Sequence, residues 1–184
     1  MRTALLTISI LFSTLLEART IIAGKGQAVA SLKQALTLAN DGDTILLKSG
    51  TYREGNNIIR KAIFLFGENG TVLDGELKHE ILTISGHDIV VRGIRFVDAG
   101  YSAMNDFAAV KLIDCEKVTI ERNTVINAYF AIHVSNSRAC TIRDNTIAGT
   151  PKSEQLSGNG IHLWKCSNAL IDNNHITGHR DGIY

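Results

Sequence analysis

The chain from residue 109 onward is built from short apolar segments in which apolar and polar positions alternate. Three segments align, with the sequences AVKLIDC at 109–115, AIHVSNS at 131–137 and GIHLWKC at 160–166. Each is followed by a second short apolar segment, and then by an asparagine that lies two residues before a β-branched residue. Alternation with a period of two over such short lengths predicts strands rather than helices.

The aligned segments recur at regular intervals. Equivalent positions lie 22 and then 29 residues apart in three sets, which are Ile120, Ile142, Ile171; Asn123, Asn145, Asn174; and Lys111, His133, His162. The seven additional residues of the longer interval fit a polar loop at Pro151–Gly158, and a similar insertion at Gly100–Asp106 brings Ile89–Val91 and Phe96 into line with the next repeat. A further repeat begins at Asp181–Ile183.

A repeat of about 22 residues with three short strands predicts an all-β fold, namely a single-stranded right-handed parallel β-helix. The Leu-x-x-Leu-x-Leu frame of leucine-rich repeats is absent. Six inward apolar side chains per coil contribute roughly 1.5–3 kcal/mol each. Ordering the backbone costs on the order of 1–2 kcal/mol per residue. A single coil is therefore unstable, and the coils must stack.

The N-terminal part of the chain follows a different pattern. Residues 28–39 have helical spacing, with Val29, Leu32, Leu36 and Ala39 on one face. We expect this helix to cap the exposed end of the stack, so that the β-helix domain at 19–184 consists of an N-terminal cap at 19–42 and coils at 43–184. Within the first coil, 44–47 is predicted to be a buried strand and 49–52 a turn. Because the chain ends inside a repeat, we expect a fragment of a longer protein.

Residues 1–18 have the features of a signal peptide. Arg2 provides the positive charge, residues 4–16 are apolar, and Ala18 is a small residue at which cleavage could follow. The apolar stretch is short for a membrane span, which needs about 20 residues. An uncleaved anchor or a buried helix is the alternative. The signal peptide predicts an exported protein.

Composition narrows the functional classes. Apolar residues make up 45% of the chain, enough for a core, and the formal charge of +1 argues against a nucleic-acid-binding protein, which usually has a basic surface. The three cysteines, Cys115, Cys140 and Cys166, have no metal-binding spacing and are expected to be buried thiols rather than a disulfide framework.

Two histidines are the main candidates for chemistry. His133 lies between Ile132 and Val134, so its side chain is expected on the outer face of the coil, and His162 occupies the equivalent position one coil later. Stacked imidazoles could share a copper ion, for which imidazole is a suitable ligand. The alternative is that the repeat stacks two surface histidines without function. His175 and His179 could join only if loops fold over.

Other polar residues are expected to be structural. The asparagine column should bond between coils, because asparagine tolerates the turns between strands and its amide can pair with the next coil. The acidic residues form no repeated pair in one column, although a glycosidase needs two carboxylates about 5–9.5 Å apart. Asp172 with His175 and Arg180 is the nearest approach to a catalytic cluster. No catalytic residues are therefore assigned.

Two N-terminal segments and the asparagine repeats carry a family resemblance. The sequences GDTILLKSGTY at 42–52 and IFLFGENGTVLDG at 63–75 resemble the first coils of pectin-lyase-like β-helix proteins. Together with the predicted signal peptide, they are most similar to the periplasmic nitrous-oxide-reductase maturation family, the NosD-like proteins, which contain carbohydrate-binding and sugar-hydrolysis repeats. The resemblance covers nearly all of the chain after the signal peptide.

The resemblance implies a periplasmic, non-enzymatic accessory protein. It would act beside an ABC transporter in assembling the copper centres of nitrous oxide reductase, with a copper chaperone as a further partner and with copper as a candidate ligand. Two alternatives stay open. One is a carbohydrate-active β-helix, such as a polysaccharide lyase, an epimerase or a sugar-binding module, and the other is a cell-surface repeat protein without a link to copper.

Overall fold

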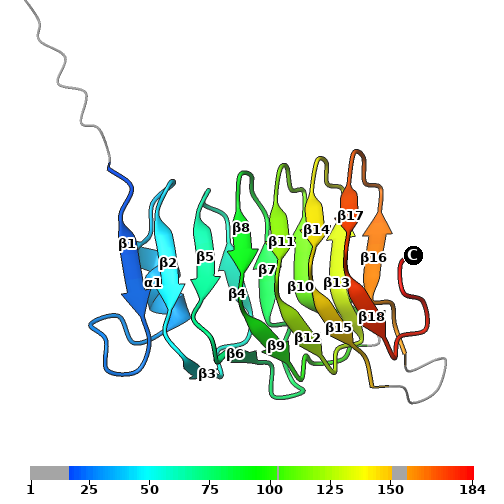
Figure 1. Ribbon diagram of the computed structural model, residues 1–184, viewed down its shortest axis with the longest axis horizontal. Helices are drawn as coiled ribbons and strands as arrows, with labels where there is room; N and C mark the ends of the chain where they lie inside the picture. Colours follow the sequence, from blue (N-terminus) through cyan, green and yellow to red (C-terminus); the bar gives the residue numbers. More distant parts are fainter. Residues whose placement is uncertain (1–16, 103, 151–156) are drawn as a thin grey trace, which may run out of the picture.

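The computed structural model describes residues 17–102, 104–150 and 157–184. These residues form an elongated stack of parallel strands, with helix α1 beside the first strands (Figure 1). Most of the predicted signal peptide, residues 1–16, lies outside the described residues, as does 151–156 of the predicted insertion. Among the described residues, no helix has the length and apolar character needed to cross a membrane.

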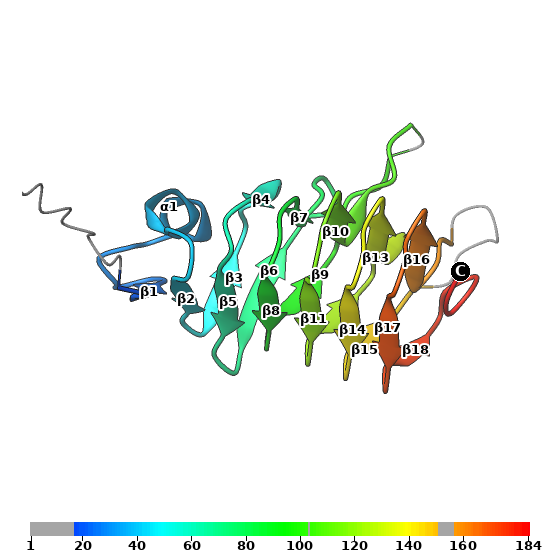
Figure 2. The ribbon, with the colours of Figure 1, turned by 90° about the horizontal axis from the view of Figure 1, so that it is seen from above.

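Three parallel sheets form the walls of the stack, as the view from above shows (Figure 2). The seven-stranded sheet contains β1 (Thr20–Ala23), β2 (Thr44–Leu47), β5 (Phe64–Gly67), β8 (Val90–Arg92), β11 (Thr119–Glu121), β14 (Thr141–Arg143) and β17 (Leu170–Asp172). The six-stranded sheet contains β3 (Gly50–Tyr52), β6 (Thr71–Asp74), β9 (Arg95–Val97), β12 (Thr124–Ile126), β15 (Thr146–Ala148) and β18 (His175–Thr177). The five-stranded sheet contains β4 (Asn57–Ile59), β7 (Leu82–Ile84), β10 (Ala108–Ile113), β13 (Phe130–Ser135) and β16 (Ile161–Trp164).

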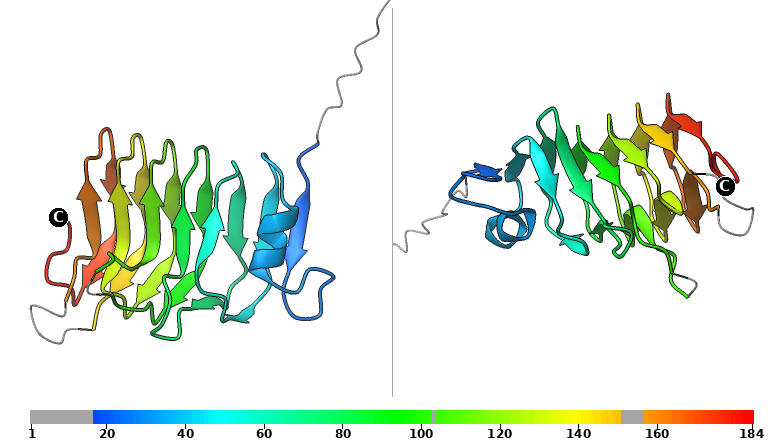
Figure 3. Two further views of the ribbon diagram at one scale, coloured as in Figure 1. Left: turned by 180° about the vertical axis from the view of Figure 1, so that it is seen from behind. Right: turned by 90° about the horizontal axis from the view of Figure 1, so that it is seen from below.

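The register of the strands follows the repeat. Ile120 pairs with Ile142, and Ile142 pairs with Ile171. The coil that contains Ile89–Val91 is also in the predicted register, because Val91 pairs with Ile120. At the far end, Ile183 forms a parallel bridge to Ile161. The predicted all-β parallel β-helix is therefore confirmed, and views from behind and below show the same succession of coils (Figure 3).

The core runs along the inside of the stack. Inward strand residues such as Leu65, Val91 and Ile120 are fully buried, and Phe96 is the largest fully buried side chain among the described residues. Each such residue packs on its equivalents in the coils above and below. Stacking therefore buries side chains that an isolated coil would leave exposed to water.

The asparagine column is a continuous hydrogen-bonded ladder, as predicted. The backbone N–H of Asn123 donates to Oδ1 of Asn145 at 3.0 Å, and the N–H of Asn145 donates to Oδ1 of Asn174 at 3.0 Å. The residue before each asparagine, Arg122, Asp144 or Asn173, has a positive φ, which bends the chain between the two strands.

The N-terminal cap differs from its prediction in two respects. Helix α1 spans only Leu32–Leu38, because Ser31 is its N-cap and residue Val29 bridges to Ala23 in extended backbone. Strand β1 precedes the helix and pairs with β2, so the seven-stranded sheet begins inside the predicted cap. The predicted strand at 44–47 is confirmed, whereas most of the predicted turn at 49–52 is strand β3.

Candidate functional site

The outer face of the five-stranded sheet carries the predicted histidine column. Lys111 of β10 pairs in register with His133 of β13, which pairs with His162 of β16. The flanking residues Ile132 and Val134 are buried on the opposite, inner face. The repeat therefore places the two imidazoles side by side on neighbouring strands.

His133 is nevertheless covered, with an exposed fraction of only 7%. Residues 104–106 of the first insertion line the same groove as His133 and His162. The ring of Phe130 packs at 5.3 Å from the His133 ring and at 5.0 Å from the His162 ring, between centroids. The side chain of His133 lies on the outer face of the sheet, but it is buried rather than exposed, because Phe130 and Asp106 contact it.

The two imidazoles meet edge to face. Their ring centroids are 5.0 Å apart with an interplanar angle of 86°. The ring of Tyr184 stacks on His162 at 5.3 Å, and the amide of Asn159 donates to Nδ1 of His162 at 2.9 Å. Nδ1 of His133 is buried and has no hydrogen-bond partner. Aromatic packing on both rings, together with the hydrogen bond from Asn159 to His162, therefore positions the pair.

Burial keeps both imidazoles neutral at pH 7. Desolvation lowers the pKa of His133 from its ordinary value of 6.5, and the neighbouring His162 and Lys111 lower this pKa further. Desolvation also lowers the pKa of His162, against the opposing charge of Asp106. Neutral imidazole is the form that binds metal ions.

These lowered pKa values predict a loss of stability in mild acid. Below pH 6.5 the unfolded chain takes up protons on His133 and His162 more readily than the folded chain does, so the free energy of unfolding should fall as the pH decreases from 6.5 toward 5. Replacing His133 by glutamine should make this fall smaller. Urea unfolding at pH 7.5 and pH 5.5 measures the difference, and His87→Gln, at an exposed position, is the control. An identical fall in wild type and His133→Gln would contradict this explanation.

Lys111 is paired with a carboxylate that the sequence did not indicate. Its Nζ forms an ion pair with Glu80, and the two side chains are 12% and 11% exposed. The hydroxyl of Thr83 also donates to Glu80. Glu80 lies in a turn before β7, outside the repeated positions, so no spacing in the sequence placed it next to the column.

A groove of about 580 Å³ lies along this column. It is lined by Met104, Asn105, Asp106, Lys111, Ile113, His133, Ser135, Asn136, His162 and Trp164. Trp164, the residue after the inward Leu163, is 56% exposed at the groove. The groove therefore combines an exposed indole ring, which can stack on a sugar ring, with a pair of neutral imidazoles, the form of histidine that binds metal ions.

The fit to copper is limited to the histidine pair. Both imidazoles are neutral and adjacent, and the unpartnered Nδ1 of His133 is a free donor atom. In the part of the chain that the structure describes, no group of three His, Cys, Asp or Glu side chains could hold a metal ion. Two imidazoles alone would have to hold a cuprous ion, and copper binding by His133 and His162 stays a prediction.

The remaining sequence candidates lie elsewhere. His175 of β18 and His179 do not line the groove. Asp172 and His175 belong to different sheets, and Arg180 contacts Asp181 and Asn159. The structure therefore places the residues of the suggested catalytic cluster on separate elements.

The three cysteines are free thiols, and Cys115 and Cys140 are buried as expected. Burial raises the pKa of both thiols. A thiol that stays protonated is a poor nucleophile and a poor metal ligand, so this environment suits a structural role.

The seven-stranded sheet carries a column in which acidic and basic residues alternate, rather than a repeated pair of carboxylates. Glu121 pairs in register with Arg143, which pairs with Asp172. The Glu121 side chain accepts from Nη2 of Arg143 at 2.6 Å, and Nη1 of Arg92 lies 3.6 Å from its other oxygen. Arg92 in turn lies over the ring of Phe66. Alternating charges stabilise this column between coils, which indicates a structural role rather than catalysis.

Comparison with known proteins agrees with this geometry. A family model described as the right handed beta helix region matches residues 103–184. The probable ABC transporter binding protein NosD of Stutzerimonas stutzeri is 31% identical over 166 residues, which is 88% of this chain. This chain is a right-handed parallel β-helix protein homologous to NosD. It spans 38% of the length of that NosD protein.

Solved structures share the fold of this NosD homologue at low sequence identity. A 4-galactohydrolase named for sulfated galactose units superposes with a TM-score of 0.54 at 15% identity, over 77% of this chain and 37% of that chain. A pectin methylesterase in complex with a hexasaccharide superposes with a TM-score of 0.52 at 15% identity, over 82% of this chain and 65% of that chain. At this identity the likeness establishes the pectin-lyase-like fold alone.

Proposed function

We propose that this NosD homologue is the β-helix part of a periplasmic accessory protein that docks on an ABC transporter and serves the assembly of the copper centres of nitrous oxide reductase. The homology to NosD over most of the chain is the observation that carries the proposal. The association with an ABC transporter is inferred from the name of that relative, a probable ABC transporter binding protein. The role in assembling nitrous oxide reductase is inferred from the family resemblance. The periplasmic location is inferred from the predicted signal peptide.

The architecture suits a docking role. Three sheets of five to seven parallel strands form long walls whose residues are fixed in register by hydrogen bonds between coils. Stacked repeats provide extended surfaces of this kind for partner proteins. In this role the protein holds its partners and needs no catalytic residues, and the histidine pair would hand over or hold a copper ion.

Co-purification tests the docking role. The tagged full chain is produced together with the ATPase and permease subunits of an ABC transporter and with nitrous oxide reductase, in cells supplied with copper. We expect the permease or the reductase to co-purify with the chain, whereas a pectin methylesterase with the same tag should retain neither. If the chain is purified without the permease and without the reductase, the docking role is contradicted.

Titration with Cu(I) tests the metal part separately. We expect wild type to bind one ion more tightly than the His133→Ala/His162→Ala variant does, and His87→Ala should bind like wild type. Equal binding by wild type and the double variant would eliminate the pair as ligands while leaving the docking role intact.

A carbohydrate-active protein is the second candidate. The exposed Trp164 beside the His133–His162 groove favours it, because an indole ring can stack on a sugar ring. Cleavage or binding of a uronate polymer that is lost in Trp164→Ala would support this candidate. Activity that persists in that variant would place any sugar site outside the groove.

A further inference from the structure

One nitrogen of the His162 ring is occupied by a buried side chain. The amide Nδ2 of Asn159 lies 2.9 Å from Nδ1 of His162, and Asn159 is fully buried. An amide nitrogen donates and does not accept, so Nδ1 of His162 must be the acceptor. A neutral imidazole carries a single proton, and the proton of His162 is therefore on Nε2.

Arg180 fixes the orientation of the Asn159 amide. Nη2 of Arg180 donates to Oδ1 of Asn159 at 3.2 Å, and a guanidinium group has no acceptor. If the amide turned over, its NH₂ group would face the guanidinium, and two donors would point at each other. Arg180 is itself held by the carboxylate of Asp181, to which its Nε donates at 3.0 Å. The oxygen of the Asn159 amide therefore stays toward Arg180 and its nitrogen toward His162.

The hydrogen bonds of His133 have the opposite arrangement. Its Nδ1 is buried and has no partner, so the hydrogen bond between its ring and the backbone of Asp106 uses Nε2. An imidazole that binds a metal ion through one nitrogen normally donates its other N–H to a carbonyl or a carboxylate. His133 therefore has the hydrogen bonding of a metal ligand, whereas His162 has that of a hydrogen-bond donor.

Copper binding by His162 would require its proton to move. Asn159 blocks Nδ1, so the metal could bind only at Nε2, which carries the proton. The proton would have to shift from Nε2 to Nδ1, and no proton would leave the ring. At Nδ1 it would meet the N–H of Asn159, so the existing hydrogen bond would be lost and two donors would face each other.

We propose that Asn159 and Arg180 are positioning residues, which hold His162 in its Nε2–H tautomer and thereby keep the affinity of the His133–His162 pair for copper low. This inference rests on the copper part of the proposed function. It also narrows that function, because a weakly held ion is suited to transfer to a partner rather than to storage.

The tautomer of His162 can be measured without copper, because protonated and bare ring nitrogens have distinct shifts in nitrogen NMR spectra. We expect the proton on Nε2 in wild type and on Nδ1 in Asn159→Asp. The new carboxylate has the shape of the amide, accepts from Nδ1 of His162 and still pairs with Arg180. Arg180→Ala is a second variant, which leaves the amide free to turn over and should show both tautomers. A wild-type proton on Nδ1, or an unchanged tautomer in both variants, would overturn the proposal.

Titration with Cu(I) in competition with a chelator measures the consequence for metal binding. We expect Asn159→Asp to bind at least about tenfold more tightly than wild type, since the hydrogen-bond partner of a ligating imidazole changes metal affinity by about 10–100-fold. Asn136→Asp is the first control, because Asn136 lines the same groove at an exposed position and gains the same charge without a bond to His162. It should bind like wild type.

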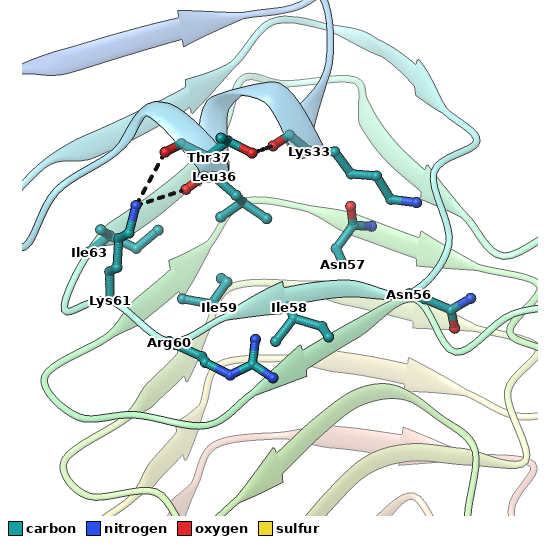
Figure 4. Close-up of a pocket in the computed structure, with 10 residues that line it drawn as sticks. All are labelled: Lys33, Leu36, Thr37, Asn56, Asn57, Ile58, Ile59, Arg60, Lys61 and Ile63. Carbon is teal, nitrogen blue, oxygen red and sulfur yellow. Dashed lines mark hydrogen bonds between the residues drawn. The ribbon is translucent and has the colours of Figure 1, made fainter.

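Asn56→Asp is the second control. Asn56 lines a separate groove of about 460 Å³ between helix α1 and strand β4 (Figure 4), and its Nδ2 lies 3.4 Å from Nδ1 of His79 at an exposed position. The variant therefore places a carboxylate beside an imidazole that is outside the pair. We expect its affinity for Cu(I) to equal that of wild type.

The same titrations separate this inference from the proposed function. Equal affinity of wild type and Asn159→Asp, despite a changed tautomer, would overturn the inference, as would an equal gain in Asn136→Asp, which would show an effect of charge alone. If wild type binds no better than His133→Ala/His162→Ala, the copper part of the proposed function is contradicted. A gain in Asn159→Asp above both would still support the role of Asn159.

Discussion

Replacing Asn145 by alanine is expected to lower the free energy of unfolding by about 2–6 kcal/mol, since two buried backbone groups lose their partner at roughly 1–3 kcal/mol each. One is the N–H of Asn123, which donates to Oδ1 of Asn145 at 3.0 Å, and the other is the carbonyl of Ile120, which accepts from Nδ2 of Asn145 at 2.9 Å. Asn145 is 1% exposed, so water cannot replace these bonds. Urea unfolding followed by circular dichroism measures the change.

Asn173 is the matched control for Asn145. It lies in the turn of the next coil, and its amide donates to Oδ1 of Asp144 at an exposed position. Asn173→Gly should cost less than about 1 kcal/mol, because water can solvate Asp144 in place of the amide and glycine tolerates the positive φ of this residue. Equal destabilisation by the two variants would show that the ladder contributes nothing specific to the stack.

Replacing Lys111 by methionine is expected to destabilise the fold by about 3–5 kcal/mol, because the carboxylate of Glu80 then stays buried without its cation. The methionine keeps most of the apolar stem of the lysine, so the lost charge dominates the effect. Pairing the change with Glu80→Gln should restore most of the lost free energy, since an amide is less costly to bury than an unpaired charge.

Thermal and urea unfolding of the single and double variants measures this coupling. A double variant that is less stable than Lys111→Met alone would contradict the pairing. Such a result would mean that the Lys111→Met variant is destabilised by altered packing of residue 111 rather than by loss of its charge.

The columns of the stack could be predicted because a repeat puts equivalent residues at equivalent places. The spacing of Ile120, Ile142 and Ile171 in the sequence was enough to predict that they stack. The same spacing predicted the hydrogen-bonded ladder that includes Asn145. Glu121, Arg143 and Asp172 have the same spacing. A search for repeated acidic residues misses this column, because its middle position is basic.

Features outside the repeat could not be predicted in the same way. Strand β1 (Thr20–Ala23) precedes the first repeat, and its pairing with β2 depends on the long connection through the helix. The burial of His133 depends on how an insertion folds back over the sheet, and Glu80 reaches Lys111 from a turn. These contacts depend on the paths of loops, which have no counterpart in neighbouring coils.

The stacking of equivalent residues on successive coils is tested most directly by a disulfide between two of them. Thr119 and Thr141 are partners in register on β11 and β14, at a strand spacing of about 4.8 Å that a disulfide can bridge. Leu170 lies on the following strand, roughly 10 Å from Thr119. In a chain whose native cysteines are replaced by alanine, mild oxidation should cross-link Thr119→Cys/Thr141→Cys and leave Thr119→Cys/Leu170→Cys reduced. A reduced first pair, or cross-linking of both pairs alike, would contradict the stacked register.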